Sequence, residues 1–320
     1  MRAWFYDSPL SPIRLEDNAA DPRPGEGEVV VQVRAAGLCH TDVGFLDGTL
    51  TGILRDFPVV LGHEFSGVVT EVGNGVDGFA PGDRVAVDNM GGYGSFRNGG
   101  YEQYTVAATR DLIPIPGDLS FEQAAIATCG GRTAYRGVVV AGGVEAGMKV
   151  GIVGLGGIGL LGAQIAKARG AEVYAAEINE AVWPNARHLG ITETVKRAKD
   201  LAPYELDVII DFAGFSDTLA GAVEAIKAGS YETLEGGRIV CAGLGEQYST
   251  IDVVQMVTKM IEIRTTSGGT AEDVANVMAM MANGSVGLRT ERIAFDEIGN
   301  GLDRLQRGNV SSRLVATMDA

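Results

Sequence analysis

Two short segments offer a thiolate and an imidazole at positions that suit a metal site. Cys39 and His63 lie 24 residues apart, each beside a stretch rich in β-forming residues, and His63 stands between Gly62 and Glu64. Zinc prefers nitrogen and sulfur ligands in tetrahedral geometry, and a catalytic zinc takes three protein ligands and keeps a fourth position open. The pair therefore predicts a catalytic zinc site that needs a third ligand.

Two further thiols are candidates for that ligand, Cys129 and Cys241. Cys241 lies in an apolar stretch typical of a strand, where a cysteine packs as a small core residue. We therefore favour Cys129, which directly precedes the second half of the chain. Glu64 could orient the metal from behind or ligate it transiently, and Asp42 could accept the second N–H of His63.

A glycine-rich loop follows the apolar run 149–153 and opens a helical pattern. In order, it reads Gly154, Leu155, Gly156, Gly157, Ile158 and Gly159. The first glycine permits a tight turn, the second lets the backbone approach a pyrophosphate, and the last lets helix and strand pack closely. A helix N-terminus then attracts the phosphates. The loop predicts a dinucleotide site that lies beside the metal.

An acidic residue, Glu177, follows the loop by 18 residues, at the end of the next apolar run. A carboxylate there can accept hydrogen bonds from both ribose hydroxyls, whereas it would repel a 2′-phosphate. The next residues, Ile178 and Asn179, carry no positive charge to offset that repulsion. NAD is therefore favoured over NADP.

Apolar strands alternate with helices from about residue 121, whereas the first 115 residues form short strands broken by Gly, Pro and Asp. The expected helices are 121–140, 159–169, 179–189, 216–227 and 270–283; the expected strands are 28–33, 67–72, 83–87, 149–153, 172–176, 206–210, 238–242 and 262–265. This pattern predicts an α/β protein in which a doubly wound parallel sheet joins a β domain. The expected boundaries are 1–130 with 269–320 for the β domain, and 131–268 for the dinucleotide domain.

Composition excludes several functions. With 26 basic and 41 acidic side chains the net charge is −15, which disfavours binding to nucleic acid or anionic lipid. No signal peptide precedes the first strand, and three cysteines make no disulfide framework, so a cytoplasmic location is expected.

Taken together, the motifs resemble those of the zinc-dependent medium-chain alcohol dehydrogenases. The matching segments are Gly37-Leu38-Cys39-His40-Thr41-Asp42, Gly62-His63-Glu64-Phe65-Ser66-Gly67, Val72–Val76, Pro81–Val85, Gly99–Tyr104, Cys129–Tyr135 and Gly154–Gly159. The resemblance covers essentially the whole chain. It implies a partly open, GroES-like β-barrel catalytic domain with a Rossmann domain, assembled as a dimer or tetramer.

The resemblance also implies roles for individual residues. Cys39, His63 and Cys129 would bind the catalytic zinc, and the Thr41 hydroxyl would pass on the proton of the alcohol. Further roles follow for the cofactor and substrate: His40 and Arg313 would contact the pyrophosphate, Thr133 would lie by the nicotinamide, and Asn89 would line the substrate pocket.

Two departures from the family pattern change these expectations. The segment 88–98 lacks the four cysteines that hold a structural zinc in many members, so we expect one zinc per chain. Gly44 stands where the family often has a proton-relaying histidine, so protons are expected to leave through Thr41, the ribose hydroxyls and water.

The leading hypothesis is an oxidoreductase that transfers hydride between an alcohol and NAD, with zinc as Lewis acid. Two alternatives stay open: a zinc-free quinone or enoyl reductase of the same superfamily, and a non-catalytic nucleotide-binding homologue. The specific alcohol is not determined by the sequence.

Overall fold

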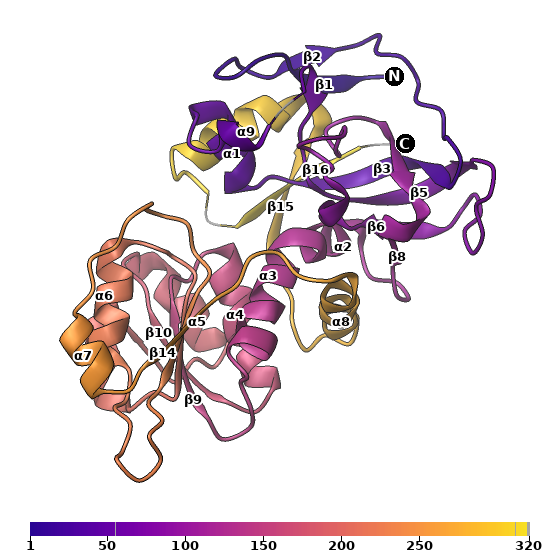
Figure 1. Ribbon diagram of the computed structural model, residues 1–320. Helices are drawn as coiled ribbons and strands as arrows, with labels where there is room; N and C mark the ends of the chain where they lie inside the picture. Colours follow the sequence, from indigo (N-terminus) through magenta and orange to yellow (C-terminus); the bar gives the residue numbers. More distant parts are fainter. Residues whose placement is uncertain (55, 311, 319–320) are drawn as a thin grey trace. The chain divides into compact units, whose positions relative to one another are not determined.

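The computed structural model describes residues 1–54, 56–310 and 312–318, and the chain forms two compact units (Figure 1). Unit 1 comprises residues 1–129, 270–283 and 288–320, and unit 2 comprises 130–269 and 284–287. Residues 311, 319 and 320, which belong to the expected segment 269–320, lie outside the described residues. No helix within the described ranges is long and apolar enough to cross a membrane.

Unit 1 is built around the long strand β3 (Glu28–Gly37), which pairs antiparallel with β5, β7 and β16. The sheet order is β15-β16-β3-β5-β6-β8, with β7 paired to β3. The other strands are β5 (Glu64–Val72), β6 (Arg84–Val87), β7 (Tyr104–Ala108), β8 (Leu112–Pro114), β15 (Thr290–Ala294) and β16 (Arg313–Thr317). Val29, Val31 and Val33 alternate into the core of this unit, as the period of a half-buried strand requires.

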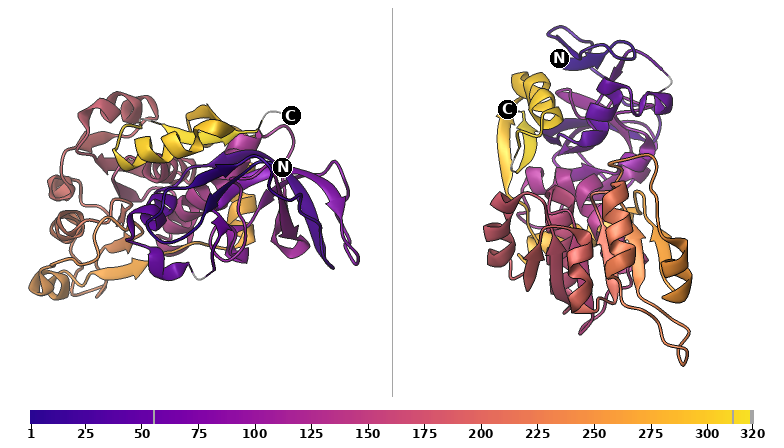
Figure 2. Two further views of the ribbon diagram at one scale, coloured as in Figure 1. Left: turned by 90° about the horizontal axis from the view of Figure 1, so that it is seen from above. Right: turned by 90° about the vertical axis from the view of Figure 1, so that its left-hand side faces the viewer.

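A smaller sheet and four helices complete unit 1. The sheet joins β2 (Arg14–Glu16), β1 (Ala3–Tyr6) and β4 (Val59–Val60). The helices are α1 (His40–Asp47), α2 (Phe121–Ile126), α8 (Ala271–Ala282) and α9 (Ile298–Gln306). Helix α9, in yellow in Figures 1 and 2, packs on α1. The start of α1 is thereby held between β3 and the C-terminal part of the chain.

The segment 88–98, which lacks cysteines, is held together by hydrogen bonds around a buried tyrosine. The Tyr93 hydroxyl donates to Asp111 Oδ2 at 2.9 Å and accepts from the Ala108 N–H at 2.9 Å. The guanidinium of Arg97 lies over the Tyr93 ring, 5.1 Å from its centroid, and pairs with Glu28 at 2.5 Å. These contacts give the segment a fixed shape without a metal.

Unit 2 is a Rossmann domain with the expected doubly wound sheet. Six parallel strands follow the order β11-β10-β9-β12-β13-β14. They are β9 (Lys149–Val153), β10 (Glu172–Ala176), β11 (Glu193–Val195), β12 (Val208–Asp211), β13 (Arg238–Cys241) and β14 (Glu262–Thr265). The order reverses at β9, where a crevice opens at the carboxyl ends of the strands.

The helices of unit 2 flank this sheet, and Figure 1 shows α4 and α6 on opposite sides of it. They are α3 (Arg132–Tyr135), α4 (Gly157–Ala168), α5 (Trp183–His188), α6 (Ser216–Ala225) and α7 (Val253–Thr258). Three elements of unit 2 were not expected from the sequence: β11, α7 and the 3₁₀ helix Ala198–Tyr204. All three are too short for a clear hydrophobic period.

The expected helix 121–140 is interrupted rather than regular. Two π-helical turns, Ala127–Gly131 and Arg136–Ala141, flank α3 and widen the helix locally. Such turns commonly occur at functional sites because they redirect side chains. The first of them contains Cys129.

A buried acid in unit 1 leads to a prediction about pH. Glu102 is 1% exposed and has hydrogen bonds to Asn98 and Thr105 but no cation partner among the described residues. Burial raises its pKa to about 8, from an ordinary value of 4.5. The Glu102 carboxyl therefore holds its proton more tightly in the folded protein than in the unfolded chain. As a result, the free energy of unfolding falls as pH rises from about 4.5 through 8.

We expect Glu102→Gln to remove this part of the pH dependence, because the amide stays neutral. The measurement is the free energy of unfolding by urea at pH 5, 6, 7 and 8, compared with the wild type and with Glu71→Gln at an exposed position of β5. Equal slopes for Glu102→Gln and the wild type would contradict the prediction.

Candidate metal centre and nucleotide pocket

Four donor atoms in unit 1 lie within 4.8 Å of one another, one each from Cys39, His63, Glu64 and Cys129. Cys39 is the residue before α1, and His63 directly precedes β5. Strands β3 and β5 pair antiparallel with Gly37 opposite Glu64. The end of one strand and the start of the other therefore bring the thiol and the imidazole together. Cys129 joins them from the π-helical turn.

The imidazole of His63 is oriented for metal binding. Its Nδ1 lies 3.2 Å from Asp42 Oδ1, and because a carboxylate accepts, Nδ1 carries the proton. Nε2 is buried and has no hydrogen-bond partner. A buried nitrogen without a partner is costly in a native protein unless something else binds it. A metal ion among two sulfurs and this nitrogen would satisfy it, so the donor set fits zinc.

The two thiols at the cluster act on each other's pKa. A hydrogen bond from Cys129 lowers the pKa of Cys39 well below its usual value, despite its burial and with the help of Arg313 and His63. The same hydrogen bond and burial raise the pKa of Cys129 well above its usual value. A metal binds cysteine as the thiolate, so zinc would displace the thiol protons on binding.

Glu64 does not face the cluster as a free carboxylate. It is fully buried and pairs through Oε1 with Arg313 of β16, while Oε2 has no hydrogen-bond partner. Burial raises the pKa of Glu64 to about 7, although Arg313 acts in the opposite direction. In this structure the Arg313 guanidinium is therefore engaged by Glu64.

The other residues expected at the site lie at varying distances from the cluster. Thr41 is close, with its Oγ1 3.7 Å from Cys39 Sγ. His40 is the exposed first residue of α1, and Asn89 begins a 3₁₀ turn two residues after β6. Thr133 belongs to α3 of unit 2.

Gly44, the position of the missing relay histidine, is closed to a side chain. It is buried in α1, and a Cβ there would lie 2.8 Å from Leu50 Cδ1. A histidine at this position would require Leu50 to move.

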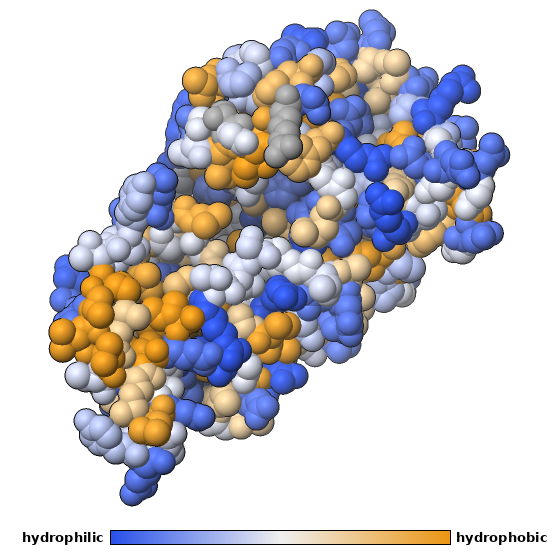
Figure 3. All heavy atoms as spheres, viewed as in Figure 1, coloured by the Kyte–Doolittle hydropathy of each residue, from blue (hydrophilic) through white to orange (hydrophobic). Residues whose placement is uncertain are grey.

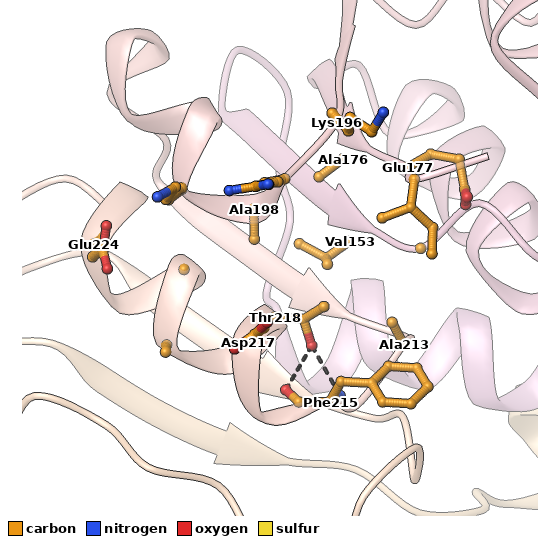
Figure 4. A pocket seen from close by; sticks show the side chains of 16 residues that line it. Val153, Ala176, Glu177, Lys196, Ala198, Ala213, Phe215, Asp217, Thr218 and Glu224 are labelled. Atoms are coloured by element: carbon orange, nitrogen blue, oxygen red, sulfur yellow. Dashed lines mark hydrogen bonds between the residues drawn. The ribbon is translucent and has the colours of Figure 1, made fainter. Parts of the chain in front are cut away.

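Gly154, the first residue of the glycine-rich loop, and Glu177 line a pocket of about 590 Å³ in unit 2 (Figure 4). Gly154 has a φ of +83°, and a Cβ on Gly159 would lie 1.8 Å from the carbonyl oxygen of Gly154, so both positions require glycine. Glu177 holds the loop through the Leu155 N–H (2.7 Å to Oε2) and also accepts from the Asn179 N–H (2.7 Å to Oε1). Gly156, Gly157 and Ile158 form the start of α4.

Three cations line the same pocket and were missed by the sequence analysis. Lys196, Arg197 and Lys199 follow β11, and Figure 4 shows Lys196 beside Glu177. The sequence-based expectation rested only on Ile178 and Asn179, the neighbours of Glu177 along the chain, whereas the fold brings these three cations to the same pocket. Lys196 pairs with Glu180 at 3.2 Å, but this pair is exposed.

Known proteins share this architecture. Residues 25–117 match the alcohol dehydrogenase GroES-like domain, and residues 157–283 match the zinc-binding dehydrogenase domain. The fold class, a GroES-like domain with a Rossmann domain, is thereby confirmed.

Relatives extend the similarity to the whole chain. An alcohol dehydrogenase of Geobacillus stearothermophilus is 29% identical over 100% of both chains, and one of Moraxella sp. is 30% identical over 92% of this chain and 93% of its own. The structure of acetophenone reductase from Geotrichum candidum in complex with NAD aligns with a TM-score of 0.88 and 29% identity, covering 99% of this chain and 97% of that one.

The donor cluster predicts the effect of removing one thiol. We expect the purified chain to bind one zinc, and Cys129→Ala to lower the bound zinc severalfold because only two strong ligands remain. Zinc per chain is measured by elemental analysis after dialysis. Cys241→Ala, which changes the free thiol of β13 in unit 2, serves as the control and should keep its zinc. Equal zinc in both variants would exclude Cys129 as a ligand.

Proposed function

The chain belongs to the zinc-type medium-chain dehydrogenase/reductase family, and from that premise we propose that it is a zinc- and NAD-dependent alcohol dehydrogenase. It is an oxidoreductase of the alcohol dehydrogenase class. The finer assignment has one main support: two thiols and an unpartnered, buried His63 Nε2 converge within 4.8 Å. A zinc-free reductase would have no use for such a costly arrangement.

Cys39, His63 and Cys129 would hold the metal, which when bound supplies a Lewis acid for the oxygen of an alcohol or carbonyl. Glu64 stays paired with Arg313 behind the donor set, or turns its free Oε2 to the metal. The absence of cysteines in segment 88–98, which is held by Tyr93, supports a single zinc per chain.

Thr41 is the proposed acid–base group. Its hydroxyl lies beside the Cys39 sulfur, and the residue is partly exposed. Oγ1 can therefore accept a proton from a substrate hydroxyl and pass its own proton toward solvent. Because Gly44 has no room for a relay histidine, we propose that protons continue through the cofactor ribose and water.

The pocket of unit 2 is the proposed cofactor site, and a bound nicotinamide supplies the hydride acceptor or donor. The loop from Gly154 to Gly159 offers backbone N–H groups at the start of α4, where phosphates are favoured. Glu177 would accept from the ribose hydroxyls, which supports NAD. We also propose that His40 and Arg313 contact the pyrophosphate and that Thr133 lies by the nicotinamide. Asn89 would line the substrate pocket.

The remaining partners are small molecules and a second copy of the chain. We propose an alcohol, aldehyde or ketone as substrate, a cytoplasmic location, and a homo-oligomer. The apolar face of α7 supports self-association, because Val253, Val254 and Val257 are 63–72% exposed. Figure 3 shows hydrophobic side chains, in orange, gathered over the part of unit 2 that contains α6 and α7.

The function is tested by NADH formation from primary, secondary, aromatic and polyol substrates, with and without a zinc chelator. We expect turnover that the chelator abolishes. Thr41→Val should lower kcat by about 100-fold or more, because acid–base groups contribute on that scale, whereas Thr41→Ser keeps the hydroxyl and most of the activity. Both variants should retain zinc. No NADH with any substrate would reject the proposal, and full activity in Thr41→Val would reject the role of Thr41.

Glu177 allows a separate test of cofactor choice. The wild type should bind NADH more tightly than NADPH, because the carboxylate repels a 2′-phosphate. Glu177→Gln should narrow the preference for NADH over NADPH about tenfold or more, since Lys196, Arg197 and Lys199 then act on the phosphate without the opposing charge of Glu177. Dissociation constants come from NAD(P)H fluorescence, with Glu235→Gln, at an exposed position of unit 2 outside the pocket lining, as the control. Tighter NADPH binding in the wild type would overturn the assignment.

A further inference from the structure

The buried carboxylate of Asp42 connects the segments that carry the proposed metal ligands. Asp42 is 0% exposed and has no lysine or arginine partner among the described residues. Instead, Oδ2 accepts from the Cys39 N–H at 3.1 Å, and Oδ1 lies 3.4 Å from the Gly62 nitrogen and 3.2 Å from His63 Nδ1. One side chain thus contacts the backbone of one ligand and the ring of another.

The fourth donor to this carboxylate comes from a different segment. The Tyr101 hydroxyl donates to Asp42 Oδ2 at 2.9 Å, and its ring is 0% exposed. The carbonyl oxygen of Gly37 is also near, at 3.3 Å, but a tyrosine has one O–H and the closer, charged acceptor takes it. Hydrogen bonds to a charged group are stronger than those between neutral groups, and a buried carboxylate is destabilised when a donor is missing.

Tyr101 and its neighbour Gly100 are hydrogen-bonded to the residues that directly precede His63. Its N–H donates to the Leu61 carbonyl at 3.1 Å, and the Gly100 N–H donates to the Gly62 carbonyl at 2.6 Å. Gly62 has a φ of +89°, and a Cβ there would lie 2.4 Å from Tyr101 Cδ1. The glycine before His63 is therefore needed to admit the tyrosine ring, so the ring and the histidine are placed together.

We propose that Tyr101 is a positioning residue of the metal centre: its hydroxyl holds the Asp42 carboxylate in the orientation that directs His63 Nε2 and Cys39 toward the metal. The proposal rests on the proposed zinc site. Without the hydroxyl, Oδ2 keeps only the Cys39 N–H, so the carboxylate is held less firmly against rotation about its last bond. The orientation of the His63 ring is then fixed less tightly. Groups that orient metal ligands in this way typically change metal affinity 10- to 100-fold.

The test measures the zinc dissociation constants of the full-length wild type, Tyr101→Phe and Tyr93→Phe by competition with a chelator. Tyr93 is the matched control, because it is also a buried tyrosine of unit 1 whose hydroxyl donates to a carboxylate at 2.9 Å. Both variants should lose stability, measured by urea unfolding of the zinc-free proteins. Only Tyr101→Phe should bind zinc about tenfold or more weakly, whereas Tyr93→Phe should stay within about twofold of the wild type.

A double-mutant cycle separates action through Asp42 from general packing. Asp42→Asn should weaken zinc binding by itself, and Tyr101→Phe should add less than about twofold in that background. If Tyr101→Phe does not fold, 4-methylphenylalanine at position 101 fills the space of the hydroxyl without donating, and the same loss of affinity is expected.

Equal affinity in Tyr101→Phe and Tyr93→Phe, or fully additive effects of the two substitutions in the cycle, would overturn the role of Tyr101. Absence of zinc binding in the wild type itself would instead reject the zinc site of the proposed function, so the two failures are distinguishable.

Discussion

A single buried carboxylate imposes the strongest constraint on unit 1. Asp42 lies in a region without lysine or arginine partners among the described residues, and a carboxylate in such a place is tolerated only when donors surround it. Its donors come from the start of α1, from the link between β4 and β5, and from Tyr101. These segments meet in the folded unit, and their meeting brings Cys39 and His63 together.

The buried cation of the donor cluster is Arg313. Glu64 and Cys39 lie beside it in the interior, and both raise the pKa of the Arg313 guanidinium. Two thiolates added to Glu64 and Asp42 would leave a large negative charge in a medium of low polarity. A divalent cation compensates that charge, so the environment as well as the ligand geometry favours a metal.

Local sequence patterns predicted the bounds of buried strands, but they missed very short elements and the π-helical interruptions of a helix. Strands β9 and β10 begin and end at the expected residues, because buried parallel strands are largely continuous apolar runs with turn residues at each end. Strand β11 has only three residues, and the helix around Cys129 contains π turns that leave its apolar pattern almost unchanged. Because β11 was not predicted, the cations that follow it could not be placed in the same pocket as Glu177.

The sequence by itself determined which groups are available: a thiol and an imidazole in segments that contain glycine, a glycine-rich loop at the start of a helix, and an acid at the end of the next strand. Residue type and spacing along the chain carry that information because turns, strands and loops are local. Only the tertiary structure decided how the groups act. The proton position on His63, the pairing of Glu64 with a guanidinium 249 residues away, and the contact of Tyr101 with Asp42 each depend on segments distant in sequence. Burial strengthens these contacts, and burial is a property of the whole fold.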